Sequence, residues 1–439
     1  MKLSQFNRFL LSNEQQFIFN SRTRCLACLD QEAIQILEEI KKSPDYEANN
    51  HTYESMIEGG LIVGNNYSEI LELSKEYENF KKGSGRSSFG FVVLPTINCI
   101  YECPYCYENK KQHQMSNSTA ECVENFIINS IQDISSVAIT WYGGEPLMAP
   151  NIIDKISQSV INYCDKTNKK YNSFIVTNGY LIDDATLEFF KRNRITGCQI
   201  TLDGTEKTHN NKRFLKTTKT GTFKKTIESI LKVLSIDMSV SIRINIDKNN
   251  LDEIDDLLCF LKQNGIVKVK ISLGWLNAAT KACAGIEKNC LTNEAYSLAF
   301  IPWMKLLKKY NFVSSDMDFY PFKSHMCSAI GDKALLIDSE GNICKCWDDI
   351  GNEENFLGDV QHHEKASSLV IDQKYKEWSP FLYESCRKCD ITPICMGGCP
   401  FQAIKDSKPQ CCKWKYILDE YLQNVISSFL EGKQTEKIL

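Results

Sequence analysis

Histidine is scarce in this chain, with six among 439 residues, whereas there are 20 cysteines. Metal chemistry here must therefore rest on thiolates, which favours iron–sulfur clusters or zinc. Long hydrophobic runs are also missing, and no stretch approaches the roughly 18 apolar residues of a membrane-spanning helix. The first residues, MKLSQFNRFLL, lack the apolar core and small-residue cleavage site of a secretion signal. The sequence therefore predicts a cytoplasmic protein.

A strong excess of charge of either sign is missing as well. The net charge is −4, and no stripe of basic residues with interleaved aromatics stands out. This balance argues against a general nucleic-acid binder. The length and the hydrophobic fraction of 43% predict two or three domains with substantial cores.

Twelve of the 20 cysteines fall in two places, three within 99–106 and nine within 327–412. Because the chain is long and shows no secretion signal, metal or redox use is favoured over disulfides. Cys25 and Cys28 form a lone CxxC in an apolar run, which fits either strand packing or a pair of metal ligands. Four others lie in apolar patterns and are expected as small core residues: Cys122, Cys164, Cys198 and Cys259.

The most informative stretch is NCIYECPYCY at 98–107, which contains Cys99, Cys103 and Cys106. It follows an apolar run, Phe89–Pro95, that reads as a buried strand, so the cysteines are expected in a loop at a strand end. A [4Fe–4S] cluster normally has four thiolate ligands, so three would leave one iron open. A partial zinc site or three buried cysteines are the alternatives.

This CxxxCxxC run, with Tyr105 just before its last cysteine, resembles the signature of the radical S-adenosylmethionine (radical SAM) enzymes. The resemblance extends over roughly residues 85–415. In that family three thiolates bind a [4Fe–4S] cluster, and the open iron binds the amino and carboxylate groups of SAM. Reduction then cleaves SAM to a 5′-deoxyadenosyl radical.

Between residues 89 and 310, apolar strands alternate with amphipathic helices. Six β/α units predict an α/β fold with a parallel, curled sheet, because crossovers are right-handed and helices cover one face. This matches the partial (β/α)6 barrel that the resemblance implies, with the active site at the carboxyl ends of the strands. The expected strands are Phe89–Leu94, Val137–Tyr142, Ser173–Thr177, Gly197–Leu202, Val240–Ile246 and Val267–Leu273. The expected helices are Glu121–Ile134, Ile152–Cys164, Ala185–Arg192, Thr222–Leu234 and Leu251–Gln263.

Polar motifs follow the second and third of these strands. Gly143, Gly144 and Glu145 lie in the sequence WYGGEP, where paired glycines allow a close backbone approach to a ligand and the carboxylate can accept from an amine. This segment resembles the one that binds the amino group of SAM in the family. Thr177 and Asn178 end the next strand and are expected to present polar groups to the ligand, with a simple Asn-Gly turn as the alternative.

After the fourth strand the sequence TLDG is followed by His209 and Arg213. This resembles the SLDG…H…R block of the subgroup that carries a C-terminal SPASM domain, with threonine in place of serine. The resemblance implies that Thr201 and Arg213 contact SAM, with the guanidinium forming a charge-assisted fork to its carboxylate. Asp203 and His209 receive no role, and a lone loop histidine is expected to be exposed.

The cysteines within 327–412, here called the second cysteine field, resemble the SPASM extension, which contains two auxiliary [4Fe–4S] clusters. A zinc ribbon is the alternative, but it would need two CxxC pairs where this region has one. The resemblance implies a distal cluster on Cys386, Cys389, Cys395 and either Cys411 or Cys412. It implies a proximal cluster on Cys327, Cys346 and Cys399. Cys344 could be the fourth ligand of the proximal cluster. If it is not, one iron of that cluster is open and could bind a substrate thiolate.

The first 84 residues read as a separate α+β unit, with strands expected at Phe17–Asn20 and Cys25–Leu29 and helices at Gln31–Lys42 and Tyr53–Glu58. The order resembles the winged-helix-like peptide-recognition elements of peptide-modifying enzymes, and a plain cap on the barrel is the alternative. Three domains are therefore expected: residues 1–84, a radical SAM barrel at 85–315 and a SPASM domain at 316–439. A small hairpin is expected at Lys333–Ile337 and Ile343–Cys346.

By this resemblance the chain is predicted to be a radical SAM/SPASM peptide maturase that installs a crosslink, with a thioether as first choice. The expected partners are a peptide or protein with a leader and a reductant such as flavodoxin or ferredoxin. The cofactors would be SAM and three [4Fe–4S] clusters.

Two alternatives stay open. The first is an anaerobic sulfatase-maturating enzyme, whose relatives tend to carry Asp directly after the second proximal-cluster cysteine, where this chain has Trp347. The second is a non-catalytic iron–sulfur or zinc protein, which would leave the GGEP and TLDG motifs unexplained.

Overall fold

The computed structural model describes residues 1–43, 45–83, 85–106, 108, 112–278, 281–314, 327–369 and 373–431. The chain forms two compact units. The first combines Met1–Lys82, Asp318–Cys327 and Glu377–Leu439, and the second combines Gly83–Met317 and Ser328–Lys376. A compact unit is not by itself a domain, so the domain ranges 1–84, 85–315 and 316–439 stay a prediction.

The second unit contains the predicted α/β fold, built on a ten-stranded sheet. Its order is β12-β11-β10-β9-β8-β7-β6-β13-β14-β15, and neighbouring strands from β6 to β11 are parallel. All six expected strands are present. They are β6 (Ser88–Thr96), β7 (Ser136–Gly143), β8 (Lys170–Thr177), β9 (Ile195–Thr201), β10 (Ser239–Ile246) and β11 (Val269–Trp275).

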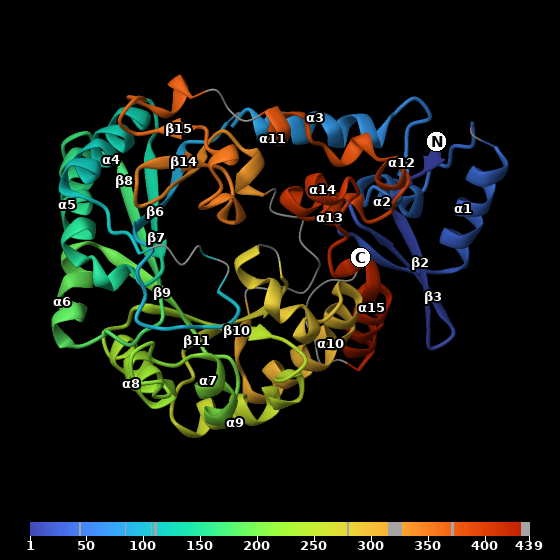
Figure 1. The fold of residues 1–439 in the computed structure, drawn as a ribbon. Helices are drawn as coiled ribbons and strands as arrows, with labels where there is room; N and C mark the ends of the chain where they lie inside the picture. Colours follow the sequence, from blue (N-terminus) through green and yellow to red (C-terminus); the bar gives the residue numbers. More distant parts are fainter. Residues whose placement is uncertain are drawn as a thin grey trace. The chain divides into compact units, whose positions relative to one another are not determined.

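The five expected helices connect these strands and line one face of the sheet (Figure 1). Their apolar sides pack onto alternate residues of the strands. In one such contact, the ring of Phe126 on the first of these helices lies against Phe91 of β6, with ring centroids 6.4 Å apart. The edge-to-face contact adds to the burial of both rings. These helices are α4 (Asn117–Ser130), α5 (Pro150–Lys166), α6 (Asp184–Arg192), α8 (Phe223–Leu234) and α9 (Ile254–Gln263).

The other face of the sheet is partly covered by the segment that follows the predicted hairpin. The hairpin strands β13 (Ala334–Ile337) and β14 (Asn342–Cys344) are antiparallel, as expected, but β13 also pairs in parallel with β6. Leu94 and Leu336 therefore face the same side, where they pack against Cys344 and Trp347. The sequence did not indicate this extension of the sheet.

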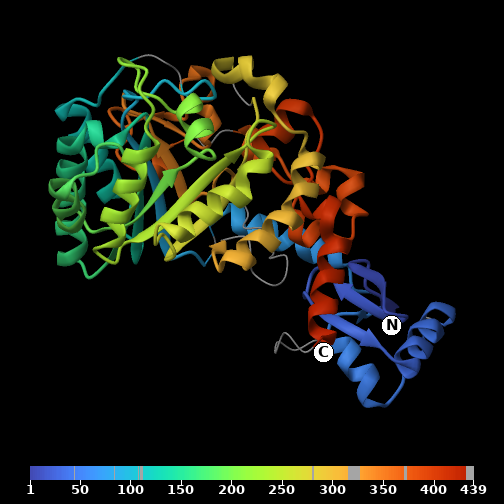
Figure 2. The same ribbon diagram turned by 90° about the horizontal axis from the view of Figure 1, so that it is seen from below.

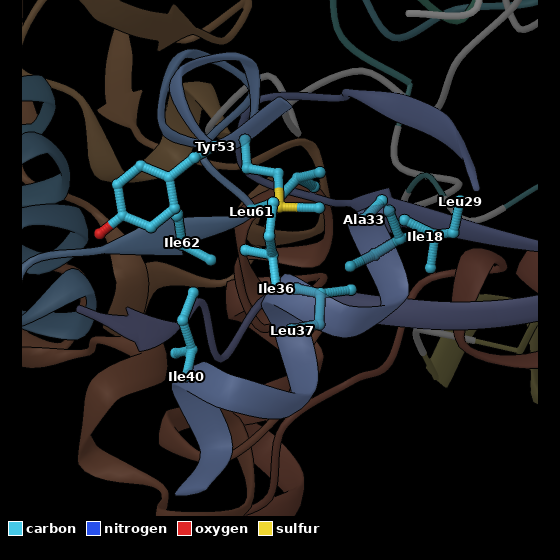
Figure 3. Close-up of a cluster of buried hydrophobic side chains, with 10 residues drawn as sticks. Ile18, Leu29, Ala33, Ile36, Leu37, Ile40, Tyr53, Leu61 and Ile62 are labelled. Atoms are coloured by element: carbon cyan, nitrogen blue, oxygen red, sulfur yellow. The ribbon is translucent and has the colours of Figure 1, made fainter. Parts of the chain in front are cut away.

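The first unit contains the N-terminal elements in the predicted order. The strand β3 (Gln15–Asn20) pairs with β2 (Asn7–Ser12) and with β4 (Leu26–Leu29). Helices α1 (Gln31–Lys42) and α2 (His51–Glu58) bury Ile36, Leu37, Tyr53 and their neighbours in one cluster, shown in Figure 3. Asp30 caps α1 by accepting from the backbone N–H of Ala33 at 2.8 Å.

The three-stranded sheet shows which N-terminal strands lie at an edge. Strand β3 is central, and the edges are β2 and β4. Cys25 packs on the cluster of Figure 3, whereas Cys28 is exposed. Residues three apart on a strand point to opposite faces, so the strand-packing reading of this CxxC is favoured.

The first unit also ties the N-terminal segment to residues 377–431. Arg8 of β2 forms ion pairs with Asp390 at 2.7 Å and with Asp419 of α15 (Trp414–Leu430) at 3.0 Å. The ring of Tyr77 packs edge-to-face on Trp378, with centroids 6.3 Å apart. Figure 2 shows α15 beside the β2–β3 strands. The N-terminal segment and residues 377–431 therefore depend on each other for burial.

The remaining elements complete the two units. No helix in the described ranges is both long and apolar enough to span a membrane. The remaining strands are β1 (Lys2–Leu3), β5 (Ile62–Val63), β12 (Val313–Ser314) and β15 (Gly358–Asp359). The remaining helices are α3 (Glu69–Lys81), α7 (Glu206–Lys212), α10 (Asn293–Tyr310), α11 (Gln373–Glu377), α12 (Glu384–Arg387), α13 (Thr392–Cys395) and α14 (Pro400–Asp406).

Candidate active site

The three cysteines of the CxxxCxxC run lie in the loop that follows β6, as predicted. The loop is shaped by a bond from the backbone N–H of Cys106 to the carbonyl of Cys103 at 3.2 Å. Burial, the Glu145 carboxylate and the neighbouring Cys103 together raise the pKa of the Cys99 thiol to about 12. Burial, the Glu108 carboxylate and Cys103 raise the pKa of Cys106 to about 11. Such thiols ionise readily only beside a cation, and a bound metal supplies that charge.

Gly143 and Gly144 bring the end of β7 against the start of this loop. A Cβ on Gly143 would lie 2.2 Å from the carbonyl oxygen of Thr96, and one on Gly144 would lie 2.3 Å from that of Asn98. Gly143 also has φ +117°, a conformation that L side chains rarely adopt. The close approach that these glycines allow is thus to the backbone just before Cys99.

Glu145 joins three of the predicted segments. Its carboxylate is fully buried and accepts from Thr177 Oγ1 at 2.7 Å, from the N–H of Asn178 at 2.8 Å and from the N–H of Leu147 at 3.1 Å. Burial raises the pKa of Glu145, and these donors oppose the rise. Asn178 Nδ2 in turn lies 3.8 Å from Cys99 Sγ. The contact of Glu145 with a SAM amino group stays a prediction.

Arg213, Asp203 and Tyr105 meet beside the loop. Arg213 Nη1 donates to the Tyr105 hydroxyl at 2.7 Å and lies 3.7 Å from Asp203 Oδ2, and the Tyr105 hydroxyl donates to the same carboxylate. Arg213 Nε is buried and has no hydrogen-bond partner among the described residues. A guanidinium with an unused, desolvated N–H fits a carboxylate ligand. Thr201, at the end of β9, is buried, and its contact with SAM stays a prediction.

His209 is not the exposed loop residue that the sequence suggested. It lies on α7 with no exposed surface, because Phe223 packs edge-on against its ring at 5.5 Å. Burial holds the pKa of His209 well below its usual value, and the nearby Arg213 guanidinium lowers it further, so the ring is neutral. Nothing in the local sequence pattern distinguished it, since α7 is a short, polar helix.

The motifs that the sequence singled out therefore gather at the carboxyl ends of β6 to β9. Comparison with known proteins shows what this arrangement belongs to: residues 93–261 match the radical SAM superfamily. The chain carries a radical SAM domain. This is a catalytic domain, so the chain is an enzyme, and the domain implies SAM and a [4Fe–4S] cluster as cofactors.

Two curated relatives are similar over different lengths. A serine-type anaerobic sulfatase-maturating enzyme from Bacteroides thetaiotaomicron is 25% identical over 388 residues, covering 76% of this chain and 89% of that protein. A GTP 3′,8-cyclase from Clostridium perfringens is 29% identical over 186 residues, covering 42% of this chain and 54% of that protein.

Solved structures are similar in fold. Native anSMEcpe with bound AdoMet matches with a TM-score of 0.64 and 18% identity, covering 77% of this chain and 99% of that one. Streptococcus suis SuiB bound to its precursor peptide SuiA matches with a TM-score of 0.55 and 16% identity, covering 94% of this chain and 98% of that one. At these identities the likeness concerns the fold alone.

Beyond the radical SAM domain, the cysteines predicted to bind the distal cluster lie in the first unit. Burial raises the pKa of Cys386 to about 11, with further contributions from Cys395, Cys411 and Cys389. The backbone N–H of Cys412 lies 3.4 Å from Cys395 Sγ. Both Cys411 and Cys412 are thus near Cys395, and the choice between them stays open. No group of three or more His, Cys, Asp or Glu in the described ranges is arranged to hold a single metal ion.

The cysteines predicted to bind the proximal cluster are divided between the two units. Cys327 and Cys399 belong to the first unit and Cys346 to the second. Cys344 has no exposed surface and packs with Leu94 and Leu336, so it behaves as a core residue. The segment YPFKSH at 320–325, which shortly precedes Cys327 and contains no cysteine, lies outside the described residues.

Proposed function

We propose that this radical SAM enzyme is a maturase that installs a crosslink, first of all a thioether, in a ribosomally made peptide. The observation that carries the proposal is the extent of its likeness to SuiB. That match leaves only 6% of the chain uncovered, so it must include most of Met1–Lys82, whereas the anSMEcpe match leaves 23% uncovered. SuiB was solved with a precursor peptide, which supports a peptide substrate for a chain with the same extent of fold.

The residues of the barrel would hold the cofactors as follows. Cys99, Cys103 and Cys106 would bind the cluster, and Arg213 would take the SAM carboxylate through its unpartnered Nε. Gly143, Gly144 and the buried Glu145 hold the cysteine loop against the ends of β7 and β8. When bound, the cluster and SAM supply a 5′-deoxyadenosyl radical that abstracts hydrogen from the substrate.

The second cysteine field would provide two auxiliary clusters. Cys386, Cys389, Cys395 and either Cys411 or Cys412 would bind one, and Cys327, Cys346 and Cys399 the other. A new bond to carbon requires that a second electron leave the substrate after hydrogen abstraction, and such clusters can accept it. Because Cys344 is packed in an apolar cluster, the proximal site would keep an open iron for a substrate thiolate. This supports a thioether as the product.

The N-terminal segment would bind the leader of the precursor. An edge strand binds an extended peptide through its outward-facing backbone groups, and β4 is such an edge. The bond from the N–H of Asn20 to the carbonyl of Cys25 fixes the register of this hairpin. Because the pattern alternates along an antiparallel pair, the N–H of Leu26 and of Cys28 point away from β3.

A sulfatase maturase is the second candidate, favoured by the 25% identity that spans 89% of the Bacteroides enzyme. Two observations weigh against it. Trp347 occupies the position directly after Cys346, and its ring packs on Tyr142 with centroids 4.4 Å apart. The N-terminal segment would have no role in that reaction. Under either candidate, flavodoxin or ferredoxin would supply electrons in the cytoplasm.

Anaerobic assay of the reconstituted full-length enzyme tests the proposal. The enzyme is incubated with SAM, a reductant and a short Cys-rich peptide encoded beside its gene, and in parallel with a sulfatase-derived peptide. A thioether is expected as loss of a hydrogen pair from the first peptide together with loss of an alkylatable thiol. An aldehyde formed only on the sulfatase peptide would overturn the proposal in favour of the second candidate.

A further inference from the structure

The backbone of Arg213 is fixed by a short relay that starts at His209. Arg213 is the C-cap residue that follows α7, and its backbone N–H donates to the carbonyl of His209 at 2.7 Å. Its own carbonyl accepts from Thr222 Oγ1 at 2.8 Å, and that hydroxyl lies 3.1 Å from His209 Nε2. Both backbone groups of Arg213 are thus tied, directly or through one hydroxyl, to the same histidine.

The same ring also reaches the partner of Arg213. His209 Nδ1 lies 3.4 Å from the backbone N–H of Asp203, whose carboxylate faces the guanidinium at 3.7 Å. Asp203 is fully buried, and its carbonyl accepts from Asn250 Nδ2 at 2.9 Å. One imidazole therefore bridges the two chain segments that carry the opposing charges.

Only one form of His209 satisfies every group in the relay. The hydroxyl of Thr222 uses its proton on the Arg213 carbonyl, so it must accept from Nε2–H. The backbone N–H of Asp203 can only donate, so Nδ1 must be an unprotonated acceptor. This is the neutral Nε2–H tautomer. A doubly protonated ring would set two N–H groups against each other beside Asp203.

We propose that His209 is a positioning residue for the SAM carboxylate, acting through Thr222 and the backbone of Arg213. The inference rests on the proposed contact between Arg213 and that carboxylate. The side chain of Arg213 donates one N–H to Tyr105, and its Nε has no partner among the described residues. A small rotation of the Arg213 backbone would therefore turn the remaining guanidinium N–H groups away from the SAM carboxylate. His209 itself touches neither SAM nor the cluster in this role.

Binding measurements on the anaerobically reconstituted holoenzyme test the proposal, with iron content checked first. Dissociation constants are measured for SAM and for decarboxylated SAM, which lacks the carboxylate. Thr222→Val keeps the shape of the side chain but loses both hydrogen bonds, and should raise the Kd for SAM roughly tenfold, about one buried hydrogen bond. The Kd for decarboxylated SAM should not change. Thr222→Ser keeps both bonds and should bind SAM as the unaltered enzyme does.

A second pair of variants covers the case in which Thr222→Val loses its iron. His209→Leu should lose the preference for SAM over decarboxylated SAM, whereas His209→Gln keeps a donor toward Thr222 and should retain most of it. Equal weakening of both compounds, or unchanged binding of both, overturns the positioning role. Arg213→Ala distinguishes the positioning role of His209 from the carboxylate contact on which it rests. If that change leaves the preference for SAM over decarboxylated SAM intact, the proposed carboxylate contact itself is wrong.

Discussion

Arg213 Nη1 donates to the hydroxyl of Tyr105 at 2.7 Å, although 107 residues lie between them in the chain. Tyr105 directly precedes the last cysteine of the loop, and Arg213 directly follows α7. The bond therefore links the loop that would bind the cluster to the cation that would bind SAM.

Replacing Cys99, Cys103 and Cys106 together with alanine should abolish reductive cleavage of SAM, because no other described thiols lie in that loop. Iron held by the second cysteine field should remain. The measurements are 5′-deoxyadenosine release and iron per chain. Cys122→Ala, on α4 outside both cysteine fields, is the matched variant and should keep both values. Undiminished 5′-deoxyadenosine from the triple variant would show that the cluster lies elsewhere.

Arg213→Ala should weaken SAM binding by about 1.5–3 kcal/mol, the range for a hydrogen bond to a charged group. Glu145→Gln should weaken binding as well, through the amino group of SAM. Equilibrium binding of SAM to the reconstituted enzyme measures both. Arg192→Ala removes an exposed ion pair to Asp154 and should leave the affinity as it was. Wild-type affinity in both site variants would refute the assigned SAM contacts.

Gly144→Ala should destabilise the fold by about 1–3 kcal/mol and loosen the cysteine loop, as overpacking typically does. Its Cβ would lie 2.3 Å from the Asn98 carbonyl oxygen, with only backbone available to shift. Thermal unfolding and iron content measure the effect. Gly285→Ala places its Cβ where no atom lies within 4 Å and should be tolerated. Similar melting of the two variants would contradict the close approach.

The neutral, buried His209 should make the folded state less stable as the pH falls below about 6.5. Below that pH the unfolded chain binds a proton that the folded chain does not bind. The free energy of unfolding therefore has its full value above that pH and declines below it. The slope from one such group approaches roughly 1.4 kcal/mol per pH unit. Urea midpoints between pH 7 and 5 should fall less steeply for His209→Gln than for the unaltered chain.

Leader binding at the edge of β4 should be sensitive to Cys28→Pro. Proline removes an N–H that points away from β3, and edge strands tolerate it there. The KM for a full-length precursor should rise, while SAM cleavage without peptide stays unchanged. Cys28→Ala keeps the N–H and should behave as wild type. Deleting residues 1–80 is a poorer test, because Arg8 and Tyr77 pack against residues 378–419 in the same unit. An unchanged KM for Cys28→Pro would leave the segment as a structural cap.

The sequence by itself determined the order and type of the barrel elements and the location of the cysteine loop. Alternation of apolar strands with amphipathic helices is a local pattern, so the six strands and five helices could be placed to within a few residues. The sequence did not predict strand β2, because two of its three apolar side chains face solvent. Phe9 and Leu11 are 49% and 64% exposed, and only Leu10 between them is buried.

Only the tertiary structure decided how distant segments meet. The approach of Gly144 to Asn98, the pairing of β13 with β6 and the burial of His209 all depend on contacts between residues far apart in the chain. No local pattern encodes such contacts, because each side chain takes its surroundings from whichever elements pack around it. His209 reads as a polar residue on a short helix, and it becomes a neutral, buried bridge only when α8 and the TLDG loop close over it.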